Sequence, residues 1–96
     1  MIDTTTRQLE GRTAFISGGS SGINLGIAKL FVARGAKVMV FGRDGAKAEA
    51  AAAAVRAETG GTIVGGSADV RDPAGVASLF SAKAATLGTP DIVIAG

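Results

Sequence analysis

The residues best suited to chemistry form a glycine- and serine-rich run at 17–26, with the sequence SGGSSGINLG. A short apolar segment precedes this run and an amphipathic segment follows it, so the run is expected to join a strand to a helix. Glycines in such a turn let the backbone approach a phosphate closely, while N–H groups of the first helical turn point at the negative charge. The run therefore predicts a pyrophosphate site for a dinucleotide, and a plain glycine-rich turn is the alternative interpretation.

A Walker-type phosphate loop is excluded, because no Gly-Lys-Ser or Gly-Lys-Thr sequence follows the run.

Arg43 is the second candidate, because it comes just after a predicted strand and about 20 residues beyond the glycine-rich run. In dinucleotide-binding domains an acidic residue at the end of this strand bonds the ribose hydroxyls of NAD, but this chain has Gly42 there. A guanidinium group can instead form charge-assisted hydrogen bonds to a 2′-phosphate. This pattern predicts NADP(H) in preference to NAD(H), whereas a solvated arginine at a helix start is the plain alternative.

Groups that could act as a catalytic acid or base are scarce in this chain. It contains no His, Cys or Tyr, and no pair of carboxylates falls in a predicted cleft. The absence of Cys excludes disulfides and thiolate metal sites. We therefore predict no catalytic residue and no metal ligand within these 96 residues.

The composition is that of one α/β unit with a small core, since 47% of the 96 residues are hydrophobic. The net charge is +2, and basic and acidic residues are interspersed. No basic cluster favours a nucleic acid or a membrane surface as partner. There is no long apolar span and no signal-like start, which favours the cytoplasm.

Apolar and amphipathic segments alternate along the chain after a polar, Thr-rich tail predicted at 1–8. Four short apolar runs predict strands, at 13–17, 37–41, 62–65 and 91–94. Three longer segments predict helices, at 22–33, 44–59 and 72–87. The alternation βαβαβαβ predicts a Rossmann-type, doubly wound parallel sheet of the α/β class, with strand order 3-2-1-4.

Two details of packing follow from the residue types. The first helix is expected to bury Ile23, Ile27, Leu30 and Phe31, which share one face. The second helix is rich in alanine, so it is expected to lie close to the sheet. The last strand would be an exposed apolar edge, which natural proteins avoid. Residues 9–96 are therefore expected to be the N-terminal half of a longer dinucleotide-binding domain.

Four residues connect the chain to a known family. Ser17, Gly18, Gly22 and Ile23 match the pattern Thr-Gly-x-x-x-Gly-Ile-Gly, and on them the chain resembles the short-chain dehydrogenase/reductase family. Ser17 replaces Thr but keeps the hydroxyl group. Asn24 replaces the third glycine and places a side chain where relatives pack closely, so Gly26 is expected to supply the missing clearance.

The resemblance continues beyond the glycine-rich run. Asp69 and Val70 stand where relatives have Asp-Val, with the acid accepting from the adenine amino group; a local turn is the alternative for Asp69. Residues 91–96 resemble the fourth strand of the family, with Ala95 and Gly96 in place of two Asn. The 2,4-dienoyl-CoA reductase-like branch of the family departs similarly after its fourth strand and has a second glycine at the position of Gly26, so the chain also resembles this branch.

The resemblance implies both a cofactor site and an activity. The implied cofactor-binding residues are Gly18, Ser20, Ser21, Gly22, Ile23, Arg43, Asp69, Val70, Ala95 and Gly96. The family's catalytic Ser and Tyr-x-x-x-Lys pair lie past its fourth strand, outside this sequence. The implied parent is an NADP(H)-dependent oxidoreductase that transfers hydride between nicotinamide and a small carbonyl, alcohol, enoyl or dienoyl substrate. Relatives are commonly homo-oligomers, dimers or tetramers.

Two alternatives remain at this point. One is a noncatalytic NADP-binding redox sensor, and the other is a stand-alone binding domain.

Overall fold

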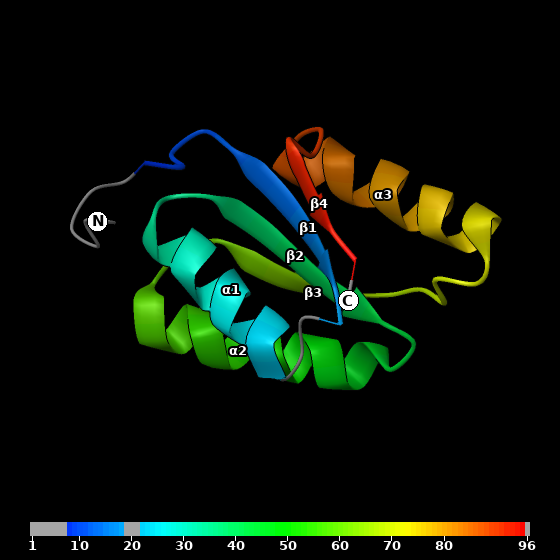
Figure 1. The fold of residues 1–96 in the computed structure, drawn as a ribbon, viewed down its shortest axis with the longest axis horizontal. Coiled ribbons are helices and arrows are strands. Elements are labelled where there is room, and N and C mark those ends of the chain that lie inside the picture. The colour runs from blue at the N-terminus through cyan, green and yellow to red at the C-terminus, as the bar shows by residue number, and fades with distance from the viewer. Residues whose placement is uncertain (1–7, 19–21, 96) are drawn as a thin grey trace.

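The computed structural model describes residues 8–18 and 22–95, and in them strands and helices alternate as the sequence predicts. The elements are β1 (Thr13–Ser17), α1 (Gly22–Ala33), β2 (Lys37–Gly42), α2 (Gly45–Thr59), β3 (Ile63–Ser67), α3 (Pro73–Leu87) and β4 (Ile92–Ile94). The strands form one parallel sheet in the order β3-β2-β1-β4 (Figure 1). The predicted fold class and strand order are confirmed.

The register brings the carboxyl ends of three strands to one edge of the sheet. β1 pairs with β2 as far as Ser17 opposite Phe41, and β2 pairs with β3 as far as Gly42 opposite Ser67. The segments that follow β1, β2 and β3 therefore meet at this edge, which is where parallel sheets place their ligand sites.

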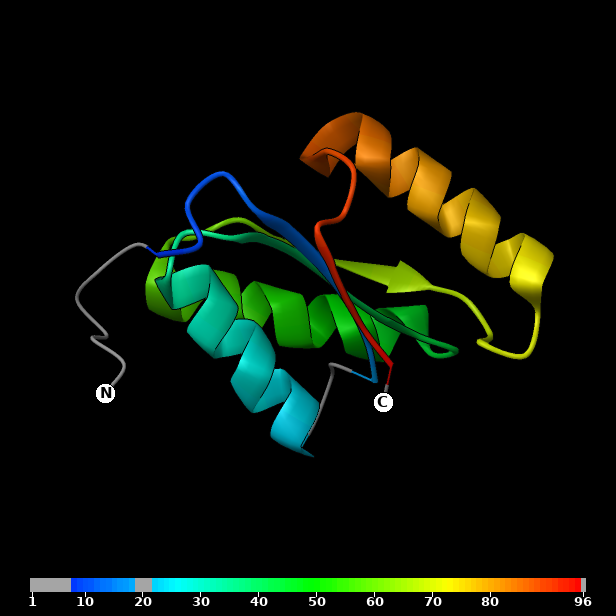
Figure 2. The ribbon, with the colours of Figure 1, turned by 45° about the horizontal axis from the view of Figure 1, so that its top comes forward.

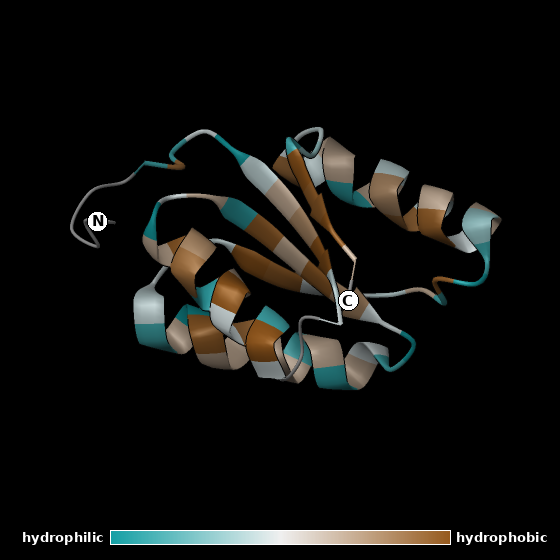
Figure 3. Ribbon diagram, in the orientation of Figure 1, coloured by the Kyte–Doolittle hydropathy of each residue, from teal (hydrophilic) through white to brown (hydrophobic). Residues whose placement is uncertain are grey.

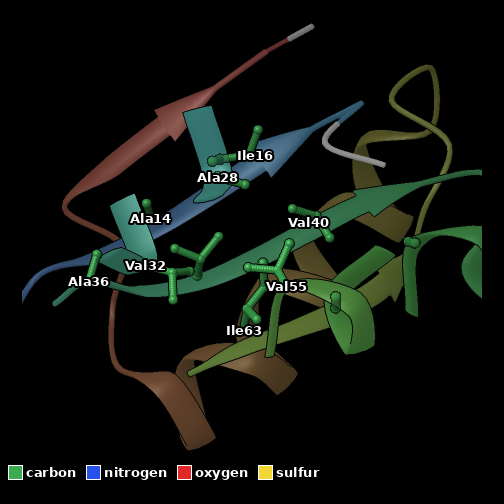
Figure 4. Packing of buried hydrophobic residues seen from close by; sticks show 11 residues of the cluster. Ala14, Ile16, Ala28, Val32, Ala36, Val40, Val55 and Ile63 are labelled. Atoms are coloured by element: carbon green, nitrogen blue, oxygen red, sulfur yellow. The ribbon is translucent and has the colours of Figure 1, made fainter. Parts of the chain in front are cut away.

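Successive side chains of each strand point to opposite faces of the sheet, so both faces are apolar. Helices cover both of them. Figure 2 shows α1 and α2 on one side of the sheet and α3 on the other. Ala14, Ile16 and Val40 point to the first side and pack in a cluster with residues of α1 and α2 (Figure 4). Phe15 and Phe41 point to the second side, where Phe80 of α3 meets both rings edge-on. In Figure 3 the strands are largely apolar and the polar residues gather in the connections and on the outer helix faces.

The buried face of α1 differs from the one predicted. Ala28 and Val32 are the buried residues, whereas Ile23 is 84% exposed and Leu30 is 37% exposed. Ile27 and Phe31 are half-buried against the cluster, as expected. The apolar periodicity marked a broad stripe, but the helix docks through the small Ala28, which lets its backbone lie close to the sheet.

The prediction that α2 lies close to the sheet is confirmed. Its buried residues are Ala48, Ala52 and Val55. A Cβ atom added to Gly65 of β3 would stand 2.5 Å from the backbone nitrogen of Glu49, so the strand and helix touch through their main chains. The Glu49 side chain also accepts a hydrogen bond from the Gly65 amide at 2.8 Å. β3 stays paired with β2 through Gly65, Gly66 and Ser67, so it extends past the end predicted at residue 65.

The last strand is anchored at its start by Asp91. Its carboxylate accepts a hydrogen bond from the Thr13 amide at 2.9 Å, and its own amide donates to the Thr13 carbonyl at 2.8 Å. Asp91 thus acts as a tie to β1, and β4 begins one residue later than predicted. No helix in the described part of the chain is long and apolar enough to cross a membrane.

Candidate functional site

A pocket of about 340 Å³ opens at the carboxyl edge of the sheet, where β1, β2 and β3 end. Its walls come from the three segments that follow these strands. The lining residues are Ser17, Gly18, Gly42, Arg43, Ala68, Asp69, Val70 and Arg71. Ser17 and Arg71 are 54 positions apart in the chain, yet both line this pocket. The register of the sheet brings them together.

The chain leaves β1 through a backbone conformation that favours glycine. Gly18 and Gly22 both have φ of +66°, in the left-handed region that side chains with a Cβ rarely adopt. The Gly18 amide donates to the Phe41 carbonyl at 2.8 Å, which fixes the end of β1 against β2. These two glycines of the predicted phosphate turn are therefore required by the backbone itself.

Asn24 and Gly26 behave differently from the prediction. The Asn24 side-chain Nδ2 donates a hydrogen bond of 2.9 Å to the Ser17 carbonyl, so this side chain joins the start of α1 to the end of β1. A Cβ atom added to Gly26 would meet no described atom within 4 Å. The expectation that Gly26 supplies clearance is wrong, because this residue lies on the exposed side of the helix.

Arg43 lies between β2 and α2, on the wall of the pocket. Its carbonyl accepts a hydrogen bond from the Ser67 hydroxyl at 3.2 Å, which links the ends of β2 and β3. Asp44 then begins α2, with its side chain accepting from the Lys47 amide at 3.0 Å. The backbone of Arg43 is held from both sides, while its side chain is exposed at the pocket.

Asp69 and Arg71 form the charged pair of the pocket. The Arg71 guanidinium donates to both carboxylate oxygens, at 3.1 and 2.9 Å, and the Arg71 amide donates to one of them at 2.9 Å. The side-chain hydrogen bond from Arg71, followed by the backbone one, lowers the pKa of Asp69 to about 2. Arg43 adds a smaller effect in the same direction, through its charge. The carboxylate in turn raises the pKa of Arg71.

Arg71 is the functional candidate that the sequence reasoning missed. An arginine two residues after an aspartate, at the start of a turn, was the available signal, because an Asx turn brings the i+2 backbone N–H back to the carboxylate. The outcome is a pocket with two guanidinium groups, Arg43 and Arg71, and one carboxylate, Asp69. The balance of these three charges is positive, which suits an anionic ligand.

The pocket brings together four of the ten predicted cofactor residues: Gly18, Arg43, Asp69 and Val70. Gly22, Ile23 and Ala95 are described but do not line it; Ala95 follows β4, which lies beside β1 rather than β2. Ser20, Ser21 and Gly96 lie outside the described residues, as does most of the predicted tail at 1–8.

The residues present fit one end of a dinucleotide. Gly18 and Gly42 leave the backbone open to a ligand, and Val70, which is 58% exposed, offers an apolar surface to a flat base. Both arginines carry a guanidinium group, which is a common partner of phosphate oxygens, and Nε and Nη2 of Arg71 already donate to Asp69. Within 8–18 and 22–95, no group of three or more His, Cys, Asp or Glu side chains could hold a metal ion.

Comparisons with known proteins point in the same direction. The family model described as short chain dehydrogenase matches residues 12–96. An uncharacterized oxidoreductase of Caenorhabditis elegans is 40% identical over 87 residues, covering 90% of this chain and 28% of that protein. The NADP-dependent (R)-specific alcohol dehydrogenase of Lentilactobacillus kefiri is 37% identical over 91 residues, covering 93% of this chain and 34% of that protein.

A solved structure agrees with these sequence matches. L-sorbose reductase from Gluconobacter frateurii, complexed with NADPH and L-sorbose, matches with a TM-score of 0.82 at 30% identity. The match covers 91% of this chain and 33% of that one. The chain thus spans about a third or less of the length of these three proteins.

Proposed function

This chain belongs to the short-chain dehydrogenase family, and we propose that it forms the NADP(H)-binding part of an oxidoreductase. The observation that carries this proposal is Arg43, which lies on the pocket wall directly after Gly42, where an NAD-binding domain would place an acid. A guanidinium at this point attracts a 2′-phosphate, whereas a carboxylate would repel it. NADP(H) is therefore the proposed cofactor, in preference to NAD(H).

Each part of the proposed site has its own task. Gly18, Ser20, Ser21, Gly22 and Ile23 would hold the pyrophosphate and the nicotinamide ribose, largely through backbone groups. Arg43 would bind the 2′-phosphate, and Asp69 and Val70 would face the adenine. Ala95 and Gly96 would form the floor of the cofactor crevice beside β1. Both oxygens of Asp69 already accept from Arg71, so the adenine amino group would use the remaining lone pairs of this carboxylate.

The proposed reaction is hydride transfer, which the nicotinamide supplies when the cofactor is bound. Two relatives support a carbonyl or alcohol substrate, since one is an (R)-specific alcohol dehydrogenase and the other an L-sorbose reductase. An enoyl or dienoyl substrate, as in the 2,4-dienoyl-CoA reductase-like branch, belongs to the same proposal. We also propose that the protein forms a homodimer or homotetramer and that it lies in the cytoplasm. The catalytic acid and base would come from residues outside this sequence.

The test is a titration of the full-length protein with NADPH and with NADH. Nucleotide fluorescence or calorimetry measures the binding. We expect NADPH to bind at least about tenfold more tightly, because one charge-assisted phosphate contact contributes about 1.5–3 kcal/mol. Equal affinities, or tighter binding of NADH, would overturn the choice of cofactor.

Turnover separates the enzyme from the alternative of a redox sensor. Oxidation of NADPH is followed with a panel of ketones, aldehydes and enoyl-CoA or dienoyl-CoA esters. Consumption of NADPH with any of them supports the oxidoreductase. Tight binding without turnover across the panel would instead favour the noncatalytic NADP-binding sensor.

A further inference from the structure

We propose that Asn24 is a positioning residue for the cofactor, which holds the first turn of α1 at a set distance from the end of β1. This inference rests on the proposed function, because it concerns how the backbone meets the pyrophosphate. Asn24 is also the one residue at which the run 17–26 departs from the family pattern by gaining a side chain, where relatives have a glycine.

The hydrogen bond joins the two sides of the glycine-rich run. Asn24 Nδ2 donates to the Ser17 carbonyl at 2.9 Å, seven residues back in the chain, and the contact is partly buried. Ser17 itself is only 5% exposed, and the next amide, that of Gly18, is bonded to the Phe41 carbonyl at 2.8 Å. The Ser17 carbonyl is therefore held in place, and its hydrogen bond with Asn24 restricts the movement of the start of α1.

In the part of the chain that the structure describes, the start of α1 has few other contacts that could hold it. Ile23 is 84% exposed, and the buried residues of the helix are Ala28 and Val32, more than one turn further along. Among the described residues of the first turn, Leu25 packs partly against the core cluster. Gly22, which begins the helix with a φ of +66°, has no side chain that could hold this end in place. A side-chain tie at Asn24 thus supplies the restraint that packing lacks.

This restraint matters for a ligand bound by backbone groups. N–H groups bind a phosphate well only when they are held in the right geometry before it arrives, since ordering them on binding reduces affinity. A helix start that moves relative to β1 would therefore weaken the pyrophosphate contacts without touching those of the adenosine end. Arg43, Asp69 and Val70 follow β2 and β3, so we expect their contacts with a ligand to change little when Asn24 is replaced.

The test compares two ligands in the full-length protein. NADPH reaches both ends of the proposed site, whereas 2′-AMP carries the adenine and the 2′-phosphate but no pyrophosphate. For Asn24→Ala we expect affinity for NADPH to fall about three- to tenfold, the range for one hydrogen bond. Affinity for 2′-AMP should stay within about twofold of wild type. Calorimetry measures both.

Asn24→Asp is the second variant, and it keeps the size of the side chain while removing the donor. An acid in the first turn of a helix is favourable for the helix, so this variant is expected to fold. Its carboxylate would face the Ser17 carbonyl and the proposed pyrophosphate, so NADPH should weaken by more than in Asn24→Ala. Gly26→Ala is the matched control in the same helix, because its added Cβ meets no described atom within 4 Å. It should bind both ligands as wild type does.

The outcomes distinguish this inference from the proposed function. Wild-type protein that does not bind NADPH would overturn both. Wild-type protein that binds NADPH, together with an Asn24→Ala variant that binds it equally well, would overturn the positioning role alone. Equal weakening of NADPH and 2′-AMP would also overturn it, since a general loss of structure would then explain the effect.

Discussion

The two sides of the proposed site work by different physical means. At the end of β1 and the start of α1, the described residues Ser17, Gly18, Gly22 and Asn24 carry no charge, and their geometry is set by hydrogen bonds and by positive φ angles. In the segments that follow β2 and β3, Arg43, Asp69 and Arg71 bring three charges to the lining of the pocket.

This difference has consequences for what each side can recognise. A site made of backbone groups recognises what NADPH and NADH share, and it is sensitive to small changes of conformation. A site made of charges discriminates between the two cofactors, and it is sensitive to salt and pH. Substitutions on the two sides should therefore have separable effects.

The largest effect is expected for Arg43→Ala. Affinity for NADPH should fall about 10- to 100-fold, because a charge-assisted contact to the 2′-phosphate is lost, while affinity for NADH should change little. Competition calorimetry with both cofactors measures this. Arg56→Ala is the matched control, since Arg56 pairs with Glu49 on α2 and does not line the pocket. An equal loss for both cofactors would contradict the division into two sides.

Gly22→Ala tests the uncharged side. Because the φ of Gly22 is +66°, the variant should lose about 1–2 kcal/mol of unfolding free energy and bind NADPH and NADH more weakly by the same factor. Gly60→Ala is a close control, since Gly60 has a φ of +71° at the end of α2 and open space around it. It should lose similar stability in chemical denaturation but keep its cofactor affinity. A change of preference between the cofactors in Gly22→Ala would argue against a shared backbone contact.

Asp44→Ala tests whether a charged residue beside Arg43 stabilises the fold without contributing to ligand binding. The Asp44 side chain caps α2 by accepting from the Lys47 amide, so its loss should lower the unfolding free energy by about 1 kcal/mol. Affinity for NADPH should stay within about twofold. Asp72 occupies the corresponding position before α3 without a side-chain cap bond among the described residues, so Asp72→Ala should cost less. Equal costs in urea unfolding would show that the cap bond adds nothing.

Arg71→Met should have the smallest effect at neutral pH and a clear one in acid. Without the guanidinium, the pKa of Asp69 should rise from about 2 toward its ordinary value of 3.8. In the wild type this lowered pKa adds stability above pH 4 that is lost as the pH falls toward 2. Wild-type stability should therefore decline more steeply than that of the variant over this interval. Carboxylate NMR titration measures the pKa directly, and an unchanged pKa in the variant would rule out Arg71 as its cause.

Much of the fold and part of the site followed from local patterns in the sequence. Alternating apolar runs and capped helical segments predicted the order of the elements, and helix caps such as Asp44 fell where expected. For the candidate site, residue type and position after a strand predicted the glycine-rich turn and Arg43, and the structure places Gly18 and Arg43 on the pocket wall. By contrast, the buried face of α1 was misjudged at Ile23, since periodicity does not say which side of a broad apolar stripe meets the sheet.

The sequence by itself therefore determined the α/β alternation, the glycine-rich turn and the basic residue after the second strand, because each is encoded within a few neighbouring residues. Only the tertiary structure decided which side chains share the pocket. The bond from Asn24 to Ser17 requires the turn to fold back on the strand, and the pairing of Arg71 with Asp69 requires the segment after β3 to turn at the carboxyl edge of the sheet. A local pattern can suggest such a turn, as the Asp-x-Arg spacing does, but only the folded backbone decides whether the donor and the acceptor meet.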